Sequence, residues 1–310
     1  MAGKRSRHTD YLVYVLVRVA ICLLQVVSWN MALAFARFLA WLAYRIDRRH
    51  RAVADENLRH AFPDLDAGQR DQLVRGTYHH FCTVMVEMIR LPRVLNRRNY
   101  RTFTHWVPAD GEQIGIRWAK CGRPLLILTG HFGNWEILGY TIGLVGLSAG
   151  IIARKIDNPY IDRMLKQLRT RTGQELLDKN EDYGKILEYL GSGRHRGMVG
   201  DQDAGARGLY VDFLGRPAST FKSIALLSLE YQAPILVIGA ARVGSPMKYR
   251  LYFEDVILPE DFSNDPDAAR AITQRYTAAL ERMIRRHPEQ YFWLHRRWKH
   301  QPKQRTRKAA

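Results

Sequence analysis

The residues best suited to chemistry lie between Leu128 and Glu136, in the stretch LTGHFGNWE. This stretch places His131 five residues before Glu136. A neutral imidazole that is oriented by a carboxylate can act as a general base toward a hydroxyl group, because the carboxylate fixes the tautomer and stabilises the imidazolium that forms. The sequence therefore predicts His131 as a base and Glu136 as its orienting carboxylate.

The same spacing occurs twice more in the chain, in the pairs His50/Asp55 and His105/Asp110. Five residues along a continuous helix turn the chain by about 500°, which leaves the two side chains on different faces of the helix. They can meet only if the histidine precedes the helix on a turn. Only His131 follows a short apolar run, residues 124–128, and precedes a helical pattern. Context therefore selects His131.

The residues between His131 and Glu136 fit a binding turn. Gly133 would let the backbone approach a ligand closely, and Asn134 is a good N-cap for the following helix. No G-x-S-x-G motif is present, so an acyl-serine intermediate has no support. The chemistry that we expect is direct transfer, in which His131 takes a proton from an alcohol that attacks an activated acyl carbon.

Elements that would position this turn alternate between strands and helices from residue 122 onward. We expect strands at 124–128, 149–153, 175–177, 197–200, 234–241 and 249–257, and helices at 137–147, 158–171, 182–190, 219–231 and 266–287. This order predicts an α/β fold, with a mixed, mostly parallel sheet sandwiched by helices. Sites in such sheets form at the carboxyl ends of strands, which is where His131 would lie.

The N-terminal part carries a long apolar segment from Tyr11 to Tyr44. Its 34 residues would make a helix of about 51 Å, against a bilayer core of about 30 Å. We expect a membrane-associated helix, broken near Ser28, that is inserted in the membrane or lies along it. A buried core helix and a cleaved signal peptide remain as alternatives.

Composition sets the remaining bounds. The chain has 310 residues and a net charge of +18, which predicts an anionic partner. A mean hydropathy of −0.30 excludes a polytopic membrane protein, and three cysteines exclude a disulfide framework. We divide the chain into a basic-flanked membrane anchor (1–50), a helical segment packing on the core (51–120), the α/β core (121–300) and a basic disordered tail (301–310).

The motif from His131 to Glu136 resembles the catalytic motif of the late lipid A acyltransferases of the lauroyl/myristoyl type, in the lysophospholipid acyltransferase superfamily. Three later blocks are similar to this family in the same order. They are Arg154 with residues 157–159, then Asp201-Gln202-Asp203 with residues 211–220, and residues 288–299.

The resemblance implies transfer of a fatty acyl group from acyl carrier protein, or acyl-CoA, to a hydroxyl of a membrane glycolipid, most simply a lipid A precursor. It implies no metal and no organic cofactor. His131 would be the base and Glu136 its partner, and Arg154 would bind acceptor phosphate or the oxyanion. Other substrate-binding residues would be Gly133, Asn134, Asp201 and Gln202. The enzyme would act at the cell inner membrane with its site toward the cytoplasm, because acyl carrier protein is cytosolic.

Other functions stay open at this point. The acceptor could be another glycolipid, such as a phosphatidylinositol mannoside. Asp201-Gln202-Asp203 also has the D-x-D form with which glycosyltransferases hold a divalent cation. The basic run from His295 to Lys299 could bind nucleic acid, but beside a membrane segment we expect an anionic membrane surface as its partner and no nucleic acid.

Overall fold

A seven-stranded sheet forms the centre of the computed structural model, which describes residues 6–153, 156–178, 183–244 and 246–302. Its strand order is β1-β9-β8-β2-β5-β3-β4; β8 and β9 are antiparallel and the other neighbours are parallel. The expected α/β fold with a mixed, mostly parallel sheet is confirmed. The strands of the sheet are β1 (Thr104–Val107), β2 (Leu126–Thr129), β3 (Ala149–Ala153), β4 (Glu175–Asp178), β5 (His195–Val199), β8 (Ile235–Arg242) and β9 (Tyr249–Ile257).

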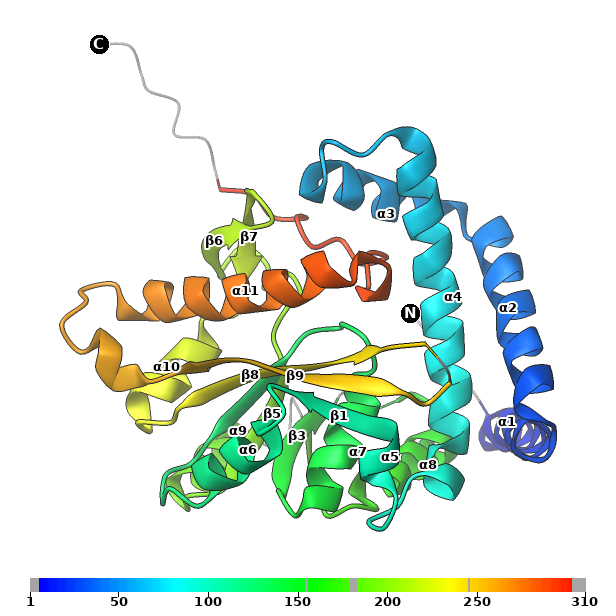
Figure 1. Ribbon diagram of the computed structural model, residues 1–310, viewed down its shortest axis with the longest axis horizontal. Helices are drawn as coiled ribbons and strands as arrows, with labels where there is room; N and C mark the ends of the chain where they lie inside the picture. The colour runs from blue at the N-terminus through cyan, green and yellow to red at the C-terminus, as the bar shows by residue number, and fades with distance from the viewer. Residues whose placement is uncertain (1–5, 154–155, 179–182, 245, 303–310) are drawn as a thin grey trace.

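Helices cover both faces of the sheet (Figure 1). One face carries α11 (Ala268–Arg286) and α9 (Tyr183–Gly191), whose Leu190 packs into the same core as α11. The other face carries α6 (Gly111–Ala119), α7 (Trp135–Val145) and α8 (Pro159–Thr170). The remaining helices are α3 (Arg48–Ala61), α4 (Ala67–Val94), α5 (Tyr100–Phe103), α10 (Ser223–Glu230), η1 (Pro259–Phe262) and η2 (Pro288–Gln290).

The central strand β2 is apolar along its whole length because both of its faces are covered. All four of its residues are buried, as expected for a parallel strand between two helical layers. Leu126 and Leu128 pack into the core with α11, and Ile127 packs into the core with α7. This buried strand fixes the position of the turn that follows it.

Two features differ from the expected elements. The segment 51–120 is not purely helical, because β1 joins the sheet edge beside β9. The helix expected at 219–231 begins only at Ser223, and a hairpin of β6 (Leu209–Phe213) and β7 (Arg216–Thr220) precedes it. The hairpin turn has positive φ at both Leu214 (54°) and Gly215 (79°), and leucine rarely adopts that conformation, so the sequence signals the turn poorly.

The N-terminal apolar segment forms two helices, α1 (Arg7–Val26) and α2 (Trp29–Ile46). The expected break near Ser28 is confirmed: Ser28 caps α2 by accepting a hydrogen bond from the Met31 N–H at 3.3 Å. The alanines Ala32 and Ala36 are fully buried where α2 packs beside α4. Small side chains on this face let the two helices approach closely.

Large apolar side chains remain exposed on both N-terminal helices. Examples are Leu16 (70% exposed), Leu23 (62%) and Trp41 (52%). By length and composition, α1 is apolar enough to cross a membrane. Both ends of α1 are nevertheless bonded to the rest of the protein: Asn158 Nδ2 donates to the Asp10 carbonyl at 2.8 Å, and Arg90 donates to the Val27 carbonyl at 2.8 Å.

Candidate active site

His131 and Asp201 meet at the carboxyl ends of two adjacent parallel strands. His131 is the second residue after β2, and Asp201 is the second residue after the neighbouring strand β5. His131 Nδ1 lies 2.7 Å from Asp201 Oδ1, and the His131 backbone N–H donates to Asp201 Oδ2 at 2.9 Å. The carboxylate therefore holds both the ring and the backbone of the histidine. With an ionised carboxylate, Nδ1 carries the proton and Nε2 is free to accept one.

The charges of the two groups support each other. Burial on its own would lower the pKa of His131, but the charge of Asp201 and its hydrogen bond outweigh burial and raise that pKa above the usual 6.5. Burial opposes ionisation of Asp201 as well, yet His131 and its hydrogen bonds hold the pKa of Asp201 well below 3.8. Asp201 is therefore an anion at neutral pH, and His131 is a stronger base than a free histidine.

The imidazole edge that carries Nε2 faces the accessible side of the site. The His131 side chain keeps 21% of its exposure, whereas the Asp201 side chain has none. The rings of Trp135 and Phe292 pack against the imidazole, with centroids 5.1 and 6.2 Å away. Gln202 Nε2 lies 3.5 Å from His131 Nε2, at the limit of a hydrogen bond. A substrate hydroxyl can therefore approach Nε2 without displacing a strong partner.

Gly133 and Asn134 shape the turn rather than line its accessible side. Gly133 has a φ of +56°, and a Cβ added there would lie 1.8 Å from the carbonyl oxygen of Ala240. Asn134 is buried and caps α7 by accepting from the Ile137 N–H at 3.0 Å. Both residues thus fix the shape of the turn, and the substrate contact that we expected of them stays a prediction.

The C-terminal segment, residues 291–302, holds the turn from the other side together with η2. The Phe292 N–H donates to the His131 carbonyl at 3.0 Å, and the Gly133 N–H donates to the Gln290 carbonyl at 2.8 Å. Gln290 itself bonds through its side-chain amide to both backbone groups of Arg242, the last residue of β8. The closing sequence block therefore holds the turn that carries His131 in place.

A buried polar network behind the turn reaches from α4 to the sheet. His80 Nε2 donates to the Gly133 carbonyl at 3.0 Å, and His80 Nδ1 accepts from Arg242 at 3.0 Å. Burial, followed by the nearby charge of Arg242, lowers the pKa of His80 to about 3, so His80 is neutral. Glu87 accepts from the Tyr249 hydroxyl, which accepts from Asn134 Nδ2 at 3.0 Å. Sequence reasoning missed this network because its members are distant along the chain.

Glu136 does not contact His131. Its carboxylate pairs instead with the Arg169 guanidinium, at 2.5 Å from Oε1 and 3.1 Å from Oε2. The reason is geometric: Glu136 is the second residue of α7, and its side chain is directed toward α8, which carries Arg169. The carboxylate that bonds the His131 ring is that of Asp201, which we had expected to contact substrate.

The D-x-D carboxylates are engaged separately. Asp201 bonds His131, whereas Asp203 Oδ2 lies 2.7 Å from His300 Nδ1 and accepts from the Gly205 N–H at 3.2 Å. Within the described ranges, no group of three His, Cys, Asp or Glu side chains could hold a metal ion. The expected position of Arg154 lies outside the described residues.

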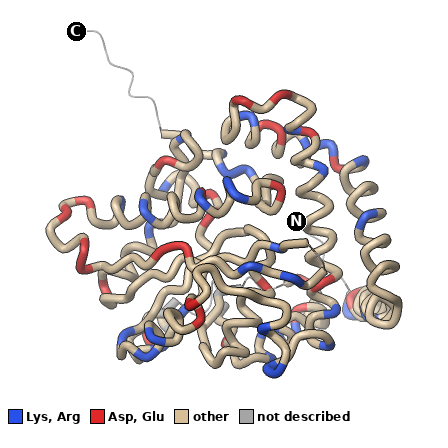
Figure 2. The backbone as a smooth tube through the Cα atoms, in the orientation of Figure 1, with Lys and Arg blue, Asp and Glu red and all other residues tan. Residues whose placement is uncertain are grey.

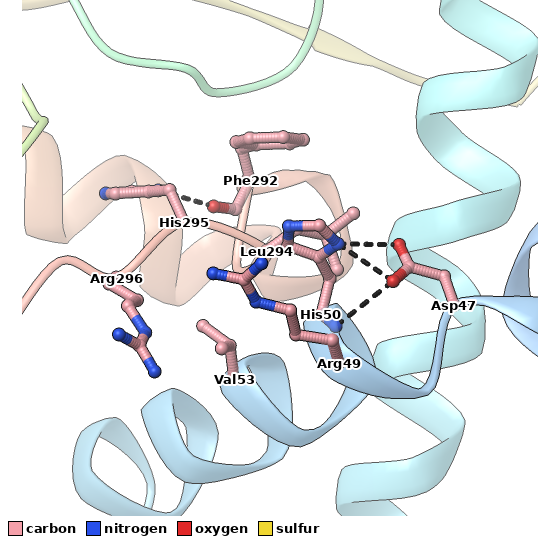
Figure 3. Close-up of a pocket in the computed structure, with 8 residues that line it drawn as sticks. All are labelled: Asp47, Arg49, His50, Val53, Phe292, Leu294, His295 and Arg296. Atoms are coloured by element: carbon pink, nitrogen blue, oxygen red, sulfur yellow. Dashed lines mark hydrogen bonds and ion pairs between the residues drawn. The ribbon is translucent and has the colours of Figure 1, made fainter. Parts of the chain in front are cut away.

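A pocket of about 510 Å³ lies between the start of α3 and the C-terminal segment. Basic residues occur on both of these elements (Figure 2). Figure 3 shows Arg49 and Val53 extending from α3 toward the segment that carries Phe292 and Arg296. The pocket is lined by Asp47, Arg49, His50, Val53, Phe292, Leu294, His295 and Arg296. Phe292 is shared between the pocket and the surroundings of His131.

Comparison with known proteins gives one consistent family. A family model described as bacterial lipid A biosynthesis acyltransferase matches residues 2–300. Among curated proteins, the chain is similar to the lipid A biosynthesis lauroyltransferase of Escherichia coli K12, with 26% identity over 85% of this chain and 84% of that protein. It is also similar to a lipid A biosynthesis acyltransferase of Haemophilus influenzae (25% identity; 84% of this chain, 81% of that one) and to the palmitoleoyltransferase of E. coli K12 (24%; 82% and 80%).

Proposed function

The chain belongs to the bacterial lipid A biosynthesis acyltransferase family and is an acyltransferase of lipid A biosynthesis, and we propose that His131 is the general base of its reaction. The observation that carries this proposal is the His131–Asp201 pair, with the carboxylate on Nδ1 and Nε2 on the accessible side. We propose acyl carrier protein, or acyl-CoA, as the donor and a hydroxyl of a lipid A precursor as the acceptor.

The proposed reaction is one direct displacement. His131 Nε2 removes the proton of the acceptor hydroxyl as its oxygen attacks the thioester carbonyl carbon. The new ester C–O bond forms and the C–S bond breaks, and the carrier thiolate takes the proton back from the imidazolium. Asp201 keeps Nδ1 protonated throughout and stabilises the imidazolium without accepting its proton. No acyl-enzyme is formed.

The residues behind the turn serve this step by holding His131 in place. The His131 backbone has two hydrogen bonds, one to Asp201 and one from Phe292. Two further bonds hold Gly133, two residues along: its carbonyl accepts from His80, and its N–H donates to the Gln290 carbonyl. A base that must be aligned with both a hydroxyl and a thioester gains from this rigidity, because small displacements of a catalytic group cost large factors in rate.

We propose that α1 and α2 lie in the membrane surface with their exposed apolar side chains in the lipid. The bonds that tie both ends of α1 to α8 and α4 argue against an upright span, because a spanning helix would leave its two ends on opposite sides of the bilayer. Arg18 and Arg37 are exposed and have long side chains that can reach the lipid head groups. The acyl acceptor then need not leave the bilayer.

The same arrangement suggests where the protein works. A cytosolic donor would place the catalytic face on the cytoplasmic side of the inner membrane. The net charge of +18 would favour both the anionic membrane surface and an acidic carrier protein. Asp203, the second D-x-D carboxylate, bonds His300, and this gives the alternative of a metal-dependent glycosyltransferase no support.

The test is a transfer assay with purified protein, labelled acyl carrier protein and a lipid A precursor in mixed micelles. Parallel reactions replace the donor with acyl-CoA or the acceptor with a phosphatidylinositol mannoside. We expect product from the wild type and from His105→Ala, a matched control at an exposed histidine, and none from His131→Ala. Full activity of folded His131→Ala would refute the assignment of the base, and product on the mannoside alone would refute the acceptor.

A further inference from the structure

The pocket between α3 and the C-terminal segment has no part in the chemistry described above. Its volume of about 510 Å³ falls in the range of small-molecule sites, about 300–1,000 Å³. Its lining combines apolar side chains, among them Val53 and Leu294, with the basic side chains of Arg49 and Arg296. Such a lining fits a ligand that has both an apolar or ring-shaped part and an anionic group.

The two arginines lack counter-ions. Arg49 and Arg296 are exposed, and neither guanidinium group has a hydrogen bond or ion pair to any described residue. By contrast, Arg59 and Arg70 near the other end of α3 both pair with Asp55. The pocket therefore presents two guanidinium groups from separate chain segments that are free to bind an added anion.

The single carboxylate in the wall is already engaged. Asp47 caps α3 by accepting from the His50 N–H, and its oxygens also contact the His50 ring at 2.8 Å and the Tyr78 hydroxyl at 3.2 Å. These contacts direct the negative charge of Asp47 toward its own partners. An anion entering the pocket meets the arginines rather than a free carboxylate.

The location of the pocket connects it with both the membrane and the base. Ile46, at the end of α2, is 71% exposed, and Asp47 and Arg49 follow at once. The lipid head groups would lie at this boundary between apolar and charged surface. On the other side, Phe292 lies between the pocket and the base. Its ring stacks on His295, with centroids 6.1 Å apart, and also packs against His131.

We propose that this pocket binds a phosphate ester of the acceptor glycolipid through Arg49 and Arg296, and so places the acceptor hydroxyl beside His131. Guanidinium groups match phosphate oxygens in a bidentate geometry, and two of them give both affinity and orientation. This inference rests on the proposed function, since the acceptor lipid is what brings the phosphate there. The phosphodiester in the pantetheine arm of the donor has the same chemistry and is the other source to be distinguished.

The kinetic test compares Arg49→Ala and Arg296→Ala with two matched controls that remove a neighbouring exposed charge outside the pocket, Arg48→Ala and Lys299→Ala. Each is assayed with the phosphorylated acceptor and with the same acceptor after enzymatic dephosphorylation. We expect each pocket variant to raise KM for the phosphorylated acceptor about tenfold, with little change in kcat. With the dephosphorylated acceptor, all the proteins should have the same KM.

The outcomes separate the sources of the phosphate. A raised KM for the acyl donor with an unchanged KM for the acceptor would support the phosphate site but overturn the acceptor as its source. Pocket variants that match the controls with both substrates would overturn the site itself. Arg49→Lys should recover part of the lost affinity, because it restores the charge without the planar fork.

A binding measurement separates this inference from the proposed function. Calorimetric titration with glucose 1-phosphate should show binding to the wild type and to Arg48→Ala, and at least tenfold weaker binding to the Arg49→Ala/Arg296→Ala double variant. A wild type that binds this probe but transfers no acyl group would refute the function and leave the site standing. A wild type that transfers acyl groups and does not bind the probe more tightly than the double variant would refute the site alone.

Discussion

Replacing Asp201 by asparagine removes the charge that holds His131 while keeping the shape of the side chain. The carboxylate accepts two hydrogen bonds from His131, one at Nδ1 and one at the backbone N–H. An amide has one oxygen and one NH₂ group, so it can accept only one of them. If its oxygen stays on the backbone N–H, the NH₂ group faces Nδ1 and forces the proton onto Nε2, where the base should accept it.

The size of the effect follows from that conflict. The alternative orientation turns the NH₂ group toward the backbone N–H and leaves a buried donor unpaired, at a cost of about 1–3 kcal/mol. Loss of the charge that stabilises the imidazolium adds to either cost. A comparable Asp-to-Asn change in another catalytic triad lowers kcat about 10⁴-fold, so we expect Asp201→Asn to lose at least about 10³-fold in kcat, or roughly 4 kcal/mol of transition-state stabilisation.

The assay is the initial rate of acyl transfer at saturating donor and acceptor. Asp203→Asn is the control, because it is the same chemical change two residues along the chain. The Asp203 carboxylate bonds His300 and not His131. Circular dichroism and urea unfolding report whether each variant folds. A folded Asp201→Asn that keeps a rate within about threefold of the wild type would refute the assignment of Asp201 as the orienting carboxylate.

Four further outcomes follow from the structure. Glu136→Gln should retain more activity than Asp201→Asn and should shift the urea midpoint, because it breaks the Arg169 pair; equal losses of activity in the two variants would contradict this. Gly133→Ala should destabilise the fold by about 2 kcal/mol or more in urea unfolding, since its Cβ would overlap the Ala240 carbonyl. Folding lowers the pKa of Asp201 from 3.8, so the ionised carboxylate stabilises the fold fully at pH values well above 3.8. That stabilisation is lost as the pH falls below 3.8, and the urea midpoints of the wild type and Asp201→Asn should therefore converge in acid. Trp41→Asp should weaken sedimentation with anionic vesicles, whereas Val107→Asp, at an exposed position outside α1 and α2, should not.

Much of the fold was predictable because apolar periodicity is a local property of the chain. The buried run that became β2 and the break at Ser28 were both visible in the sequence. The β6–β7 hairpin was not, because its turn depends on a leucine held at positive φ. The four-residue strand β1 was missed as well, since its assignment depends on pairing with β9, more than a hundred residues later.

The site was predictable only in part. His131 could be chosen from its position after an apolar strand, but its partner could not be chosen from spacing, because hydrogen-bonding depends on which strands are neighbours. Adjacency of β2 and β5 brings Asp201 to the imidazole, while α7 carries Glu136 away to Arg169. The network of His80, Glu87 and Arg242 has no local signal at all, since each residue alone looks like an ordinary helical or strand position.

The most direct test of the central claim is the single-turnover rate of acyl transfer as a function of pH, for the wild type and for folded His131→Ala. The pair with Asp201 raises the pKa of His131 above 6.5, so the base is neutral at alkaline pH and is lost to protonation as the pH falls. We predict a wild-type rate that declines through one protonation above pH 6.5, and a variant rate about 10³-fold lower without that step. A variant that keeps the same pH profile, or a rate near that of the wild type, would contradict the account.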